Sequence, residues 1–165
     1  MKVGFIGLGA MGRHMAARLE AAGHALQTYD LNGKGNRKSA REAAAGVEVV
    51  FTSLPGPAEV EAVSKDLGPV TAWFDTSTNS PEVVRRLNRS FPLLDAPVSG
   101  GPKGAESGKL AIWVGGDESL FKRYESLLKT LGDQPCYVGP IGAGTIAKLA
   151  HNMASFTIQA PIGPT

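Results

Sequence analysis

The sequence predicts a doubly wound α/β domain with a largely parallel sheet that ends in a long C-terminal helix. Three observations support this prediction. Short apolar runs, typical of buried strands, alternate with segments of helical periodicity along the chain. A glycine-rich turn directly follows the first apolar run. The 165 residues leave room for one domain with its own core, but not for a second full domain.

Each apolar run predicts a strand, and each stretch of helical periodicity predicts a helix. The expected strands are Lys2–Ile6, Ala25–Tyr29, Val47–Leu54, Ala72–Asp75, Leu93–Ala96, Leu110–Val114 and Cys136–Val138. The expected helices between them are Met11–Ala22, Ser39–Ala45, Ala58–Lys65, Pro81–Ser90 and Ser119–Leu131. Ser80 is a suitable N-cap, and Pro81 suits a first helical turn because proline lacks only an N–H that has no helical partner there.

A final helical pattern runs from Gly142 to about Ala160, where Pro161 and Pro164 end it. At about 1.5 Å per residue it would be roughly 27 Å long, which is long for the closing element of a small domain. Its apolar residues point at too many angles for one face to bury them all: Ile146, Leu149, Ala150, Met153, Phe156, Thr157, Ile158 and Ala160. We therefore expect a further unit, or a second copy of the chain, to pack on it.

Composition and charge exclude several classes of function. The 17 basic and 15 acidic residues give a formal net charge of +2 and are mixed along the chain, so nucleic acid is not an expected partner. No apolar segment is long enough to cross a membrane, and the first run meets Arg13 and His14 too early for a signal peptide. The single cysteine, Cys136, lacks a disulfide partner and the spacing of a metal site. We expect Cys136 to be buried, the protein to be cytoplasmic, and no metal to be bound.

The segment Gly7-Leu8-Gly9-Ala10-Met11-Gly12 matches the dinucleotide-binding pattern G-x-G-x-x-G. It follows an apolar strand, opens a helix and leads to a second strand, as a Rossmann-type fold requires. Gly7 permits a tight turn, Gly9 lets a pyrophosphate approach the backbone, and Gly12 lets helix and strand pack closely. Free N–H groups at the helix start would then bind the phosphates. The alternative is a strand-turn-helix without a cofactor.

Asp30 ends the second expected strand at nearly the spacing of an acidic residue that binds the adenosine ribose. A carboxylate there favours NAD because it would repel the 2′-phosphate of NADP. Lys34, Arg37 and Lys38 follow in the expected surface loop Asn32–Lys38 and could offset this repulsion if they fold back, which leaves NADP as the alternative. A solvated loop aspartate is the other interpretation.

Three further stretches carry a resemblance to a known family. They are Asp95-Ala96-Pro97-Val98-Ser99-Gly100-Gly101 with the following Pro102-Lys103-Gly104-Ala105, then Asp75-Thr76-Ser77-Thr78, and Gly142-Ala143-Gly144-Thr145-Ile146-Ala147-Lys148-Leu149-Ala150-His151-Asn152. Together they resemble signatures of the β-hydroxyacid dehydrogenases, which include 3-hydroxyisobutyrate dehydrogenase and, more distantly, 6-phosphogluconate dehydrogenase. The resemblance covers the chain from Met1 to about Met153. It implies NAD(P)-dependent oxidation of a small β-hydroxyacid to its semialdehyde, or the reverse.

The residues of these stretches suit that chemistry. Ser99, Gly100 and Gly101 would form a concavity, poor in side chains, whose N–H and O–H donors bind a carboxylate; the alternative is a simple glycine turn. Lys148 and Asn152 are four apart and project from one helix face. The resemblance implies that Lys148 is the acid/base, that Asn152 orients it, and that Leu54, Pro55 and Thr78 line the cofactor. Leu54 would fit the core equally well, and an ordinary solvated lysine is the alternative for Lys148. We expect Gly144 to leave room for the nicotinamide ring.

Two features depart from the family. His151 replaces the first of the paired asparagines that usually follow the lysine, and we assign no chemistry to it, to His14 or to His24. The family's helical domain also does not follow the last helix, so we expect a dinucleotide-binding domain at residues 1–141 and the start of an interdomain helix at residues 142–165. Two alternatives to the hydroxyacid dehydrogenase remain: a non-catalytic NAD(P)-binding module and a relative that reduces imines. We expect a homo-oligomer formed through the last helix.

Overall fold

A computed structural model describes the backbone of residues 1–159 and the side chains of residues 1–155. One eight-stranded sheet has the order β2-β1-β3-β4-β5-β7-β6, and β8 pairs with β7. Its strands are β1 Lys2–Ile6, β2 Ala25–Tyr29, β3 Val49–Thr52, β4 Trp73–Asp75, β5 Leu93–Asp95, β6 Val98–Ser99, β7 Ala111–Gly115 and β8 Pro135–Gly139. The pairs from β2 to β5, and β7 with β8, are parallel, while β7 runs antiparallel to β5 and β6. The predicted doubly wound, largely parallel sheet is confirmed.

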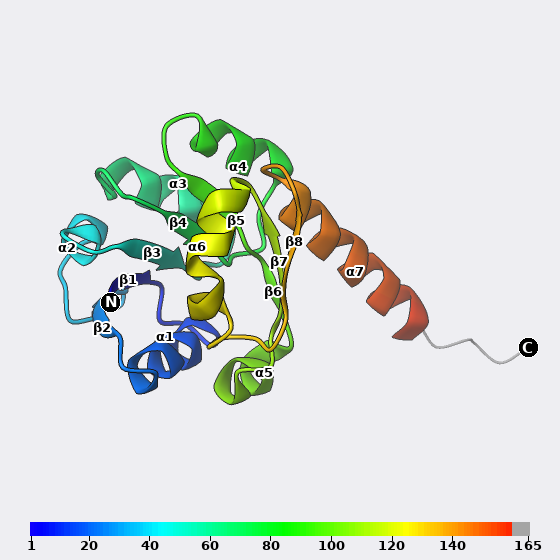
Figure 1. Ribbon diagram of the computed structural model, residues 1–165, viewed down its shortest axis with the longest axis horizontal. Helices are drawn as coiled ribbons and strands as arrows, with labels where there is room; N and C mark the ends of the chain where they lie inside the picture. The colour runs from blue at the N-terminus through cyan, green and yellow to red at the C-terminus, as the bar shows by residue number, and fades with distance from the viewer. Residues whose placement is uncertain (160–165) are drawn as a thin grey trace, which may run out of the picture.

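The described helices cover both faces of this sheet (Figure 1). They are α1 Gly12–Ala21, α2 Ala40–Ala44, α3 Pro57–Asp66, α4 Pro81–Asn88, α5 Gly101–Ser107, α6 Glu118–Leu128 and α7 Ala143–Gln159. Helices α1, α5 and α6 pack on one face, and α2, α3 and α4 pack on the other. Glu61 of α3 forms an ion pair with Arg86 of α4.

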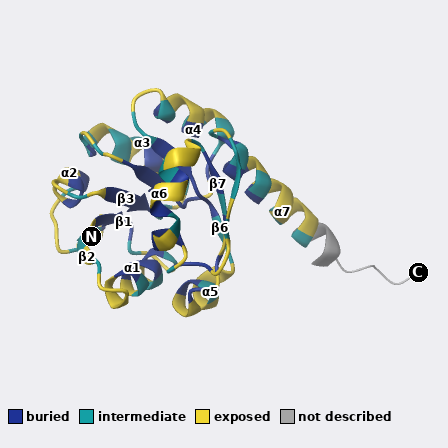
Figure 2. Cartoon of the chain, viewed as in Figure 1, coloured by how far each residue is buried: buried dark blue, intermediate teal, exposed yellow. Residues whose placement is uncertain are grey.

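Side-chain alternation along the strands divides the core into two layers. Phe5, Phe51 and Phe74 point to the α1 and α6 side, where they stack in sequence and Tyr124 meets the last ring edge-on. Their neighbours Ile6 and Trp73 point to the opposite side. The central strands β1, β3, β4 and β5 are therefore buried from both faces (Figure 2), as expected for parallel strands covered by helices.

The predicted elements form with small differences at their ends, and two elements were not predicted. Strand β6 is only two residues long, and α5 begins at Gly101, inside the segment predicted as a glycine-rich concavity. Neither contains a stretch of apolar periodicity. The predicted cap of α4 is confirmed, since Ser80 accepts a hydrogen bond from the Glu82 N–H and Pro81 starts the helix. The prediction that Cys136 is buried is wrong, because its side chain is exposed on β8.

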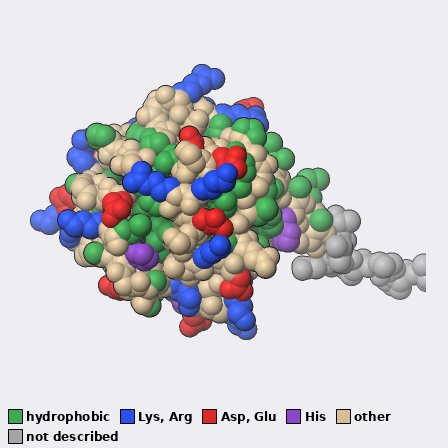
Figure 3. Space-filling model, in the orientation of Figure 1, with side chains coloured by type: hydrophobic (Ala, Val, Ile, Leu, Met, Phe, Trp, Pro, Cys, Tyr) green, Lys and Arg blue, Asp and Glu red, His purple; other side chains and the backbone are tan. Residues whose placement is uncertain are grey.

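Helix α7 packs its first turns on β7, β8, β5 and α4 and then extends away from the body of the domain (Figure 1). Its exposed apolar residues include Ile146, Leu149 and Met153, with 49%, 37% and 72% of their surface exposed. Hydrophobic side chains are visible along this projecting helix in Figure 3. The residues of the predicted apolar pattern from Phe156 onward, and the prolines after them, lie outside the described side chains. None of the described helices is long and apolar enough to cross a bilayer.

Candidate functional site

Two hollows lie at the carboxyl ends of the parallel strands, where doubly wound folds bind ligands. The first, about 370 Å³, adjoins the turn after β1 and the end of β2. The second, about 280 Å³, is lined by the loops after β3 and β4, the segment from Val98 to Gly101, and α7. Ser53 and Leu54 line both hollows, so the two are adjacent at the loop after β3.

The glycine-rich turn has the geometry that a dinucleotide requires. Gly7 has a φ of +95°, and a Cβ there would lie 2.3 Å from the Ser53 carbonyl oxygen. A Cβ on Gly12 would lie 1.9 Å from the Gly7 carbonyl oxygen, so only glycine lets α1 start this close to β1. A Cβ on Gly9 would meet nothing within 4 Å, and Gly9 lines the first hollow. The turn thus leaves open space at the position where a pyrophosphate would approach the backbone, and the residues fit a dinucleotide.

Asp30 is buried at the end of β2 beside this turn. Its Oδ2 accepts a hydrogen bond from the Leu8 N–H at 2.7 Å, and its Oδ1 accepts one from the Asn32 N–H at 2.8 Å. Burial alone would raise the pKa of this carboxyl, but these hydrogen bonds and the nearby Lys34 charge lower it. Asp30 is therefore ionised at neutral pH, and each oxygen keeps a lone pair for a ribose hydroxyl.

The charged residues around the first hollow are acidic. Asp30, Glu59 and Asp66 line it, together with Leu54 and Pro55. Arg37 of the loop after β2 is directed elsewhere, since its guanidinium donates to Gln27 Oε1 and the Asn36 carbonyl. Arg37 therefore does not fold back toward Asp30, as it would have to do to favour NADP.

The second hollow brings together residues that are far apart in the sequence. Lys148 shares it with Ser99, Gly100, Gly101 and Thr78. The other residues that line it are Met11, Ser53, Leu54, Thr76, Ser77 and Val98. Asn152 does not line it, because it lies one turn further along α7. Of the predicted pair, Lys148 lines the hollow and Asn152 does not.

Lys148 is almost completely buried, with 8% of its surface exposed. Its Nζ lies 6.0 Å from the centre of the Trp113 ring. Within the described residues, no carboxylate forms an ion pair with it. Desolvation by burial therefore lowers the pKa of the Lys148 ammonium group, which favours a neutral amine. Such a lysine is a suitable general base.

Ser99 contacts the residue that departs from the family pattern. Its Oγ lies 3.3 Å from His151 Nε2, and the His151 ring lies 5.0 Å from the Trp113 ring. No chemistry was expected of His151, since a histidine on an expected helix gives no sign of what it faces. Only the crossing of α7 over β6 and β7 reveals this contact.

The two glycines after Ser99 lie at the start of α5. Gly100 has a φ of +132° and Gly101 a φ of +63°, conformations that side chains other than glycine rarely adopt. Both residues are exposed at the second hollow. The expected concavity is thus the beginning of a short helix, where backbone N–H groups lack helical partners.

Beneath the hollows lies a polar network that the sequence analysis missed. Asp75, completely buried, accepts hydrogen bonds from Thr52 Oγ1, the Ser77 N–H and Asn79 Nδ2. Ser77 in turn accepts a hydrogen bond from the Leu54 N–H at 2.9 Å. Burial raises the pKa of Asp75, against the effect of these hydrogen bonds. The network links the loops after β3 and β4, which both line the second hollow.

The expected role of Gly144 is wrong. A Cβ on Gly144 would lie 2.5 Å from the Trp113 carbonyl oxygen and 2.6 Å from the Asp95 carbonyl oxygen. The position that a side chain would occupy thus faces β5 and β7. Because glycine has no side chain there, α7 can lie close to the sheet. The missing side chain therefore does not create space for a nicotinamide ring.

Comparisons with known proteins agree with this architecture. The family model for the NAD binding domain of 6-phosphogluconate dehydrogenase matches residues 2–142. The NAD-dependent L-serine dehydrogenase of Pseudomonas aeruginosa is 35% identical over 92% of this chain and 58% of its own length. The solved structure of Mycobacterium tuberculosis 3-hydroxyisobutyrate dehydrogenase with L-serine is 36% identical, with a TM-score of 0.84 over 93% of this chain and 60% of its own. An imine reductase from Myxococcus stipitatus has a TM-score of 0.84 over 96% of this chain and 61% of its own but is 16% identical, so it shares the fold alone. The chain spans 58–60% of the two dehydrogenases.

Proposed function

The chain belongs to the β-hydroxyacid dehydrogenase family, whose NAD-binding domain it contains, and we propose that it serves the oxidation of a small β-hydroxyacid to its semialdehyde, or the reverse reduction. One observation carries this proposal. A buried Lys148, which has no carboxylate partner among the described residues, lines the same hollow as Ser99 and the cofactor-side residues Leu54 and Thr78. Residues 1–141 act as the dinucleotide-binding domain, and α7 begins the connection to the rest of the active site.

The first hollow binds the adenosine half of the cofactor. The turn from Gly7 to Gly12 offers its backbone to the pyrophosphate, and Asp30 accepts hydrogen bonds from the ribose. Leu54, Pro55 and Thr78 extend this surface toward the second hollow. The acidic lining of the first hollow favours NAD, with NADP as the weaker ligand.

The second hollow binds the substrate. A nicotinamide cofactor held by the first hollow would supply the hydride acceptor or donor for this reaction. Ser99, Gly100 and Gly101 hold the substrate carboxylate through the hydroxyl and the N–H groups at the start of α5. Lys148 Nζ, as the neutral amine, takes the proton of the substrate hydroxyl during oxidation and returns it during reduction. Asn152, one turn along α7, orients the substrate hydroxyl and Lys148.

Two related proteins suggest which acids to try. L-serine is the substrate named for the Pseudomonas aeruginosa relative, and 3-hydroxyisobutyrate for the Mycobacterium tuberculosis one. Both are small acids with a hydroxyl on the β-carbon. We propose the same class for this chain. A reducing compartment such as the cytoplasm remains a prediction from its single cysteine.

The test is a steady-state assay with L-serine and 3-hydroxyisobutyrate and either nicotinamide cofactor, run on a fusion of this chain with the helical domain of a relative, alongside calorimetric titration of NAD⁺ on the same sample. Turnover that is lost in Lys148→Ala supports the proposal. NAD⁺ binding without turnover of any β-hydroxyacid would instead favour the non-catalytic module. A lysine-independent turnover of cyclic imines would favour the imine-reducing alternative.

A further inference from the structure

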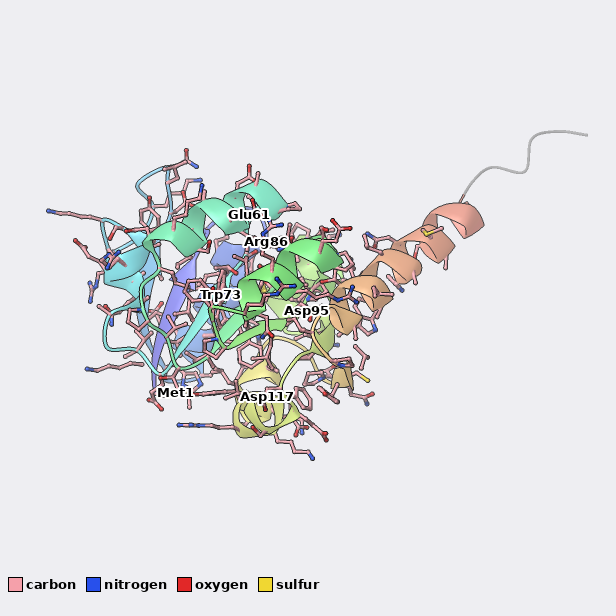
Figure 4. The ribbon with its side chains drawn as sticks, turned by 90° about the horizontal axis from the view of Figure 1, so that it is seen from above. Met1, Glu61, Trp73, Arg86, Asp95 and Asp117 are labelled. Atoms are coloured by element: carbon pink, nitrogen blue, oxygen red, sulfur yellow. The ribbon has the colours of Figure 1, made fainter. Side chains whose placement is uncertain are left out.

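We propose that Asp95 is a positioning residue that holds the first turn of α7, and with it Lys148, against the carboxylate-binding segment. The proposal rests on the function proposed for Lys148. Asp95 is completely buried at the end of β5 and touches neither hollow. Figure 4 shows it beside the base of α7.

The Asp95 carboxylate binds the start of α7 through both oxygens. Its Oδ1 accepts a hydrogen bond from the Gly142 N–H at 2.8 Å. Its Oδ2 accepts two from Thr145, one from the N–H at 2.6 Å and one from the hydroxyl at 2.8 Å. The first N–H groups of a helix have no partner within the helix, and an anion there is also favoured by the helix dipole. Because this carboxylate comes from β5, it fastens the helix to the sheet.

Close backbone packing restrains the same turn of α7. Gly144 lies against the carbonyl oxygens of Trp113 and Asp95, and a Cβ on Gly115 would lie 2.8 Å from the Gly144 N. The glycines fix how near the helix lies to the sheet, and the hydrogen bonds to Thr145 fix its rotation. Lys148 is three residues after Thr145 and lies on the same helix face. The rotation set at Thr145 therefore determines where Lys148 points.

Asp95 also begins the segment on the other side of the second hollow. Ala96 follows it and donates its N–H to the Asp75 carbonyl oxygen at 2.8 Å. Ser99 comes four residues after Asp95 along this segment. One side chain thus ties the helix that carries Lys148 to the strand that leads into Ser99. Burial raises the pKa of Asp95 while its hydrogen bonds oppose the shift.

The experiment compares Asp95→Asn with a matched control, Asp117→Asn. Asp117 caps α6, where its carboxylate accepts two backbone N–H bonds and one hydroxyl bond, the same types of donor that Asp95 binds. It is exposed and lies on a different helix (Figure 4). The asparagine at 95 replaces one acceptor oxygen with an amide that faces an N–H donor. Both variants lose a helix cap, but only one cap lies beside Lys148.

Three readouts are taken on the 165-residue chain: amide hydrogen exchange of α7, the NMR titration of Lys148 at its Cε, and NAD⁺ affinity. In Asp95→Asn we expect exchange at Gly142 and Thr145 to accelerate by about tenfold or more, since each loses a bond to a charged acceptor. The titration midpoint of Lys148 should rise toward its ordinary value as the side chain gains water. NAD⁺ affinity should stay within about twofold, because the turn after β1 is separate from α7. Asp117→Asn should leave the Lys148 titration unchanged.

A second pair of variants covers the case in which Asp95→Asn does not fold. Thr145→Val removes the hydroxyl bond and keeps the N–H, whereas Thr145→Ser keeps both. The proposal is supported if the titration midpoint of Lys148 is raised in Thr145→Val but keeps its wild-type value in Thr145→Ser. An unchanged midpoint in every folded Asp95 and Thr145 variant, or an equal rise in Asp117→Asn, overturns it. Turnover enters none of these outcomes, so a fusion with the helical domain of a relative that oxidised no β-hydroxyacid would contradict the proposed function alone.

Discussion

The preference for NAD over NADP can be tested on this chain directly. Asp30 is buried beside the glycine-rich turn, and its hydrogen bonds from Leu8 and Asn32 keep it ionised. The 2′-phosphate of NADP would meet this carboxylate, in a hollow whose other charged lining residues are Glu59 and Asp66. We therefore expect NAD⁺ to bind more tightly, and Asp30→Asn to remove most of the difference.

The size of the preference follows from two effects. A hydrogen bond from a ribose hydroxyl to a carboxylate contributes about 1.5–3 kcal/mol, and NADP lacks the 2′-hydroxyl that makes it. Repulsion adds to this, since two unit charges about 4 Å apart interact by roughly 4 kcal/mol near a protein surface before salt screening reduces it. The hydrogen bond alone corresponds to a factor of about ten to a hundred, at 1.4 kcal/mol for each tenfold. We expect a ratio of dissociation constants of about ten to a thousand.

Calorimetric titration of both cofactors with wild type and Asp30→Asn measures this ratio. In the variant the ratio should fall to within a few-fold, mainly because NADP⁺ binds better. The pKa of Asp30 is lowered from 3.8, so its carboxylate stays charged from pH 6 to pH 8, and any rise of the preference with pH in this range comes from the second ionisation of the 2′-phosphate, at about pH 6. The ionised Asp30 carboxylate also contributes to the free energy of unfolding. This contribution is present at these pH values and is lost only as the pH falls through the lowered pKa of Asp30. Equal or tighter NADP⁺ binding by the wild type would refute the reasoning and would assign the outcome to the basic loop after β2.

Four further predictions concern α7. Lys148→Ala, in a fusion of this chain with the helical domain of a relative, should lower turnover by about a hundredfold to ten-thousandfold with NAD⁺ affinity nearly unchanged; near-normal turnover would exclude Lys148 as the acid/base. In the unmutated fusion, the rate of hydroxyacid oxidation should rise with pH through the Lys148 pKa, which lies below 10.5, because only the neutral amine accepts a proton; a flat pH profile would contradict this. Gly144→Ala should lower the free energy of unfolding in urea by about 1–3 kcal/mol, because its Cβ would meet backbone oxygens of β5 and β7; unchanged stability would mean that α7 moves freely. The isolated chain should turn over hydroxyacids poorly and self-associate through the exposed face containing Ile146 and Leu149, and light scattering should show less association when both are changed to Glu; a monomeric, fully active wild type would contradict both expectations.

The sequence predicted the sheet well because parallel strands buried on both faces appear as apolar runs separated by helical segments. Strand β1 was predicted residue by residue. The turn after it was predicted as well, because Gly7 and Gly12 occupy positions where a side chain would collide with the backbone, so the glycine pattern marks the turn. The short elements β6 and α5 were missed for the opposite reason. The two residues of β6 are too few to show periodicity. For α5, the adjacent glycines Gly100 and Gly101 indicate a turn whether or not a helix follows.

Candidate site residues were predictable where a motif fixes them relative to neighbouring residues. Lys148 and Ser99 were both singled out, yet their meeting at one hollow depends on how α7 crosses the sheet, which no local pattern determines. Gly144 illustrates the limit. It was expected to face the cofactor because it shares a helix with Lys148, but the helix needs a glycine on the side that faces β5 and β7.

The buried carboxylates explain why the site can be preorganised within this one domain. Thr52, Asp75 and Asp95 occupy paired register positions at the ends of β3, β4 and β5. In the sequence they appear as the polar residues that end apolar runs, a position where a side chain usually meets water. In the structure each is buried. The Thr52 carbonyl oxygen accepts a hydrogen bond from Thr76 Oγ1, Asp75 accepts from Ser77 and Asn79, and Asp95 accepts from Gly142 and Thr145. A polar group buried in this way is stable only while its partners stay in place, so the row holds the loops that line both hollows in one arrangement. Cofactor binding should therefore depend on Thr52 and Asp75, which hold the loops after β3 and β4, whereas the approach of Lys148 to a substrate depends on the hydrogen bonds between Asp95 and the start of α7.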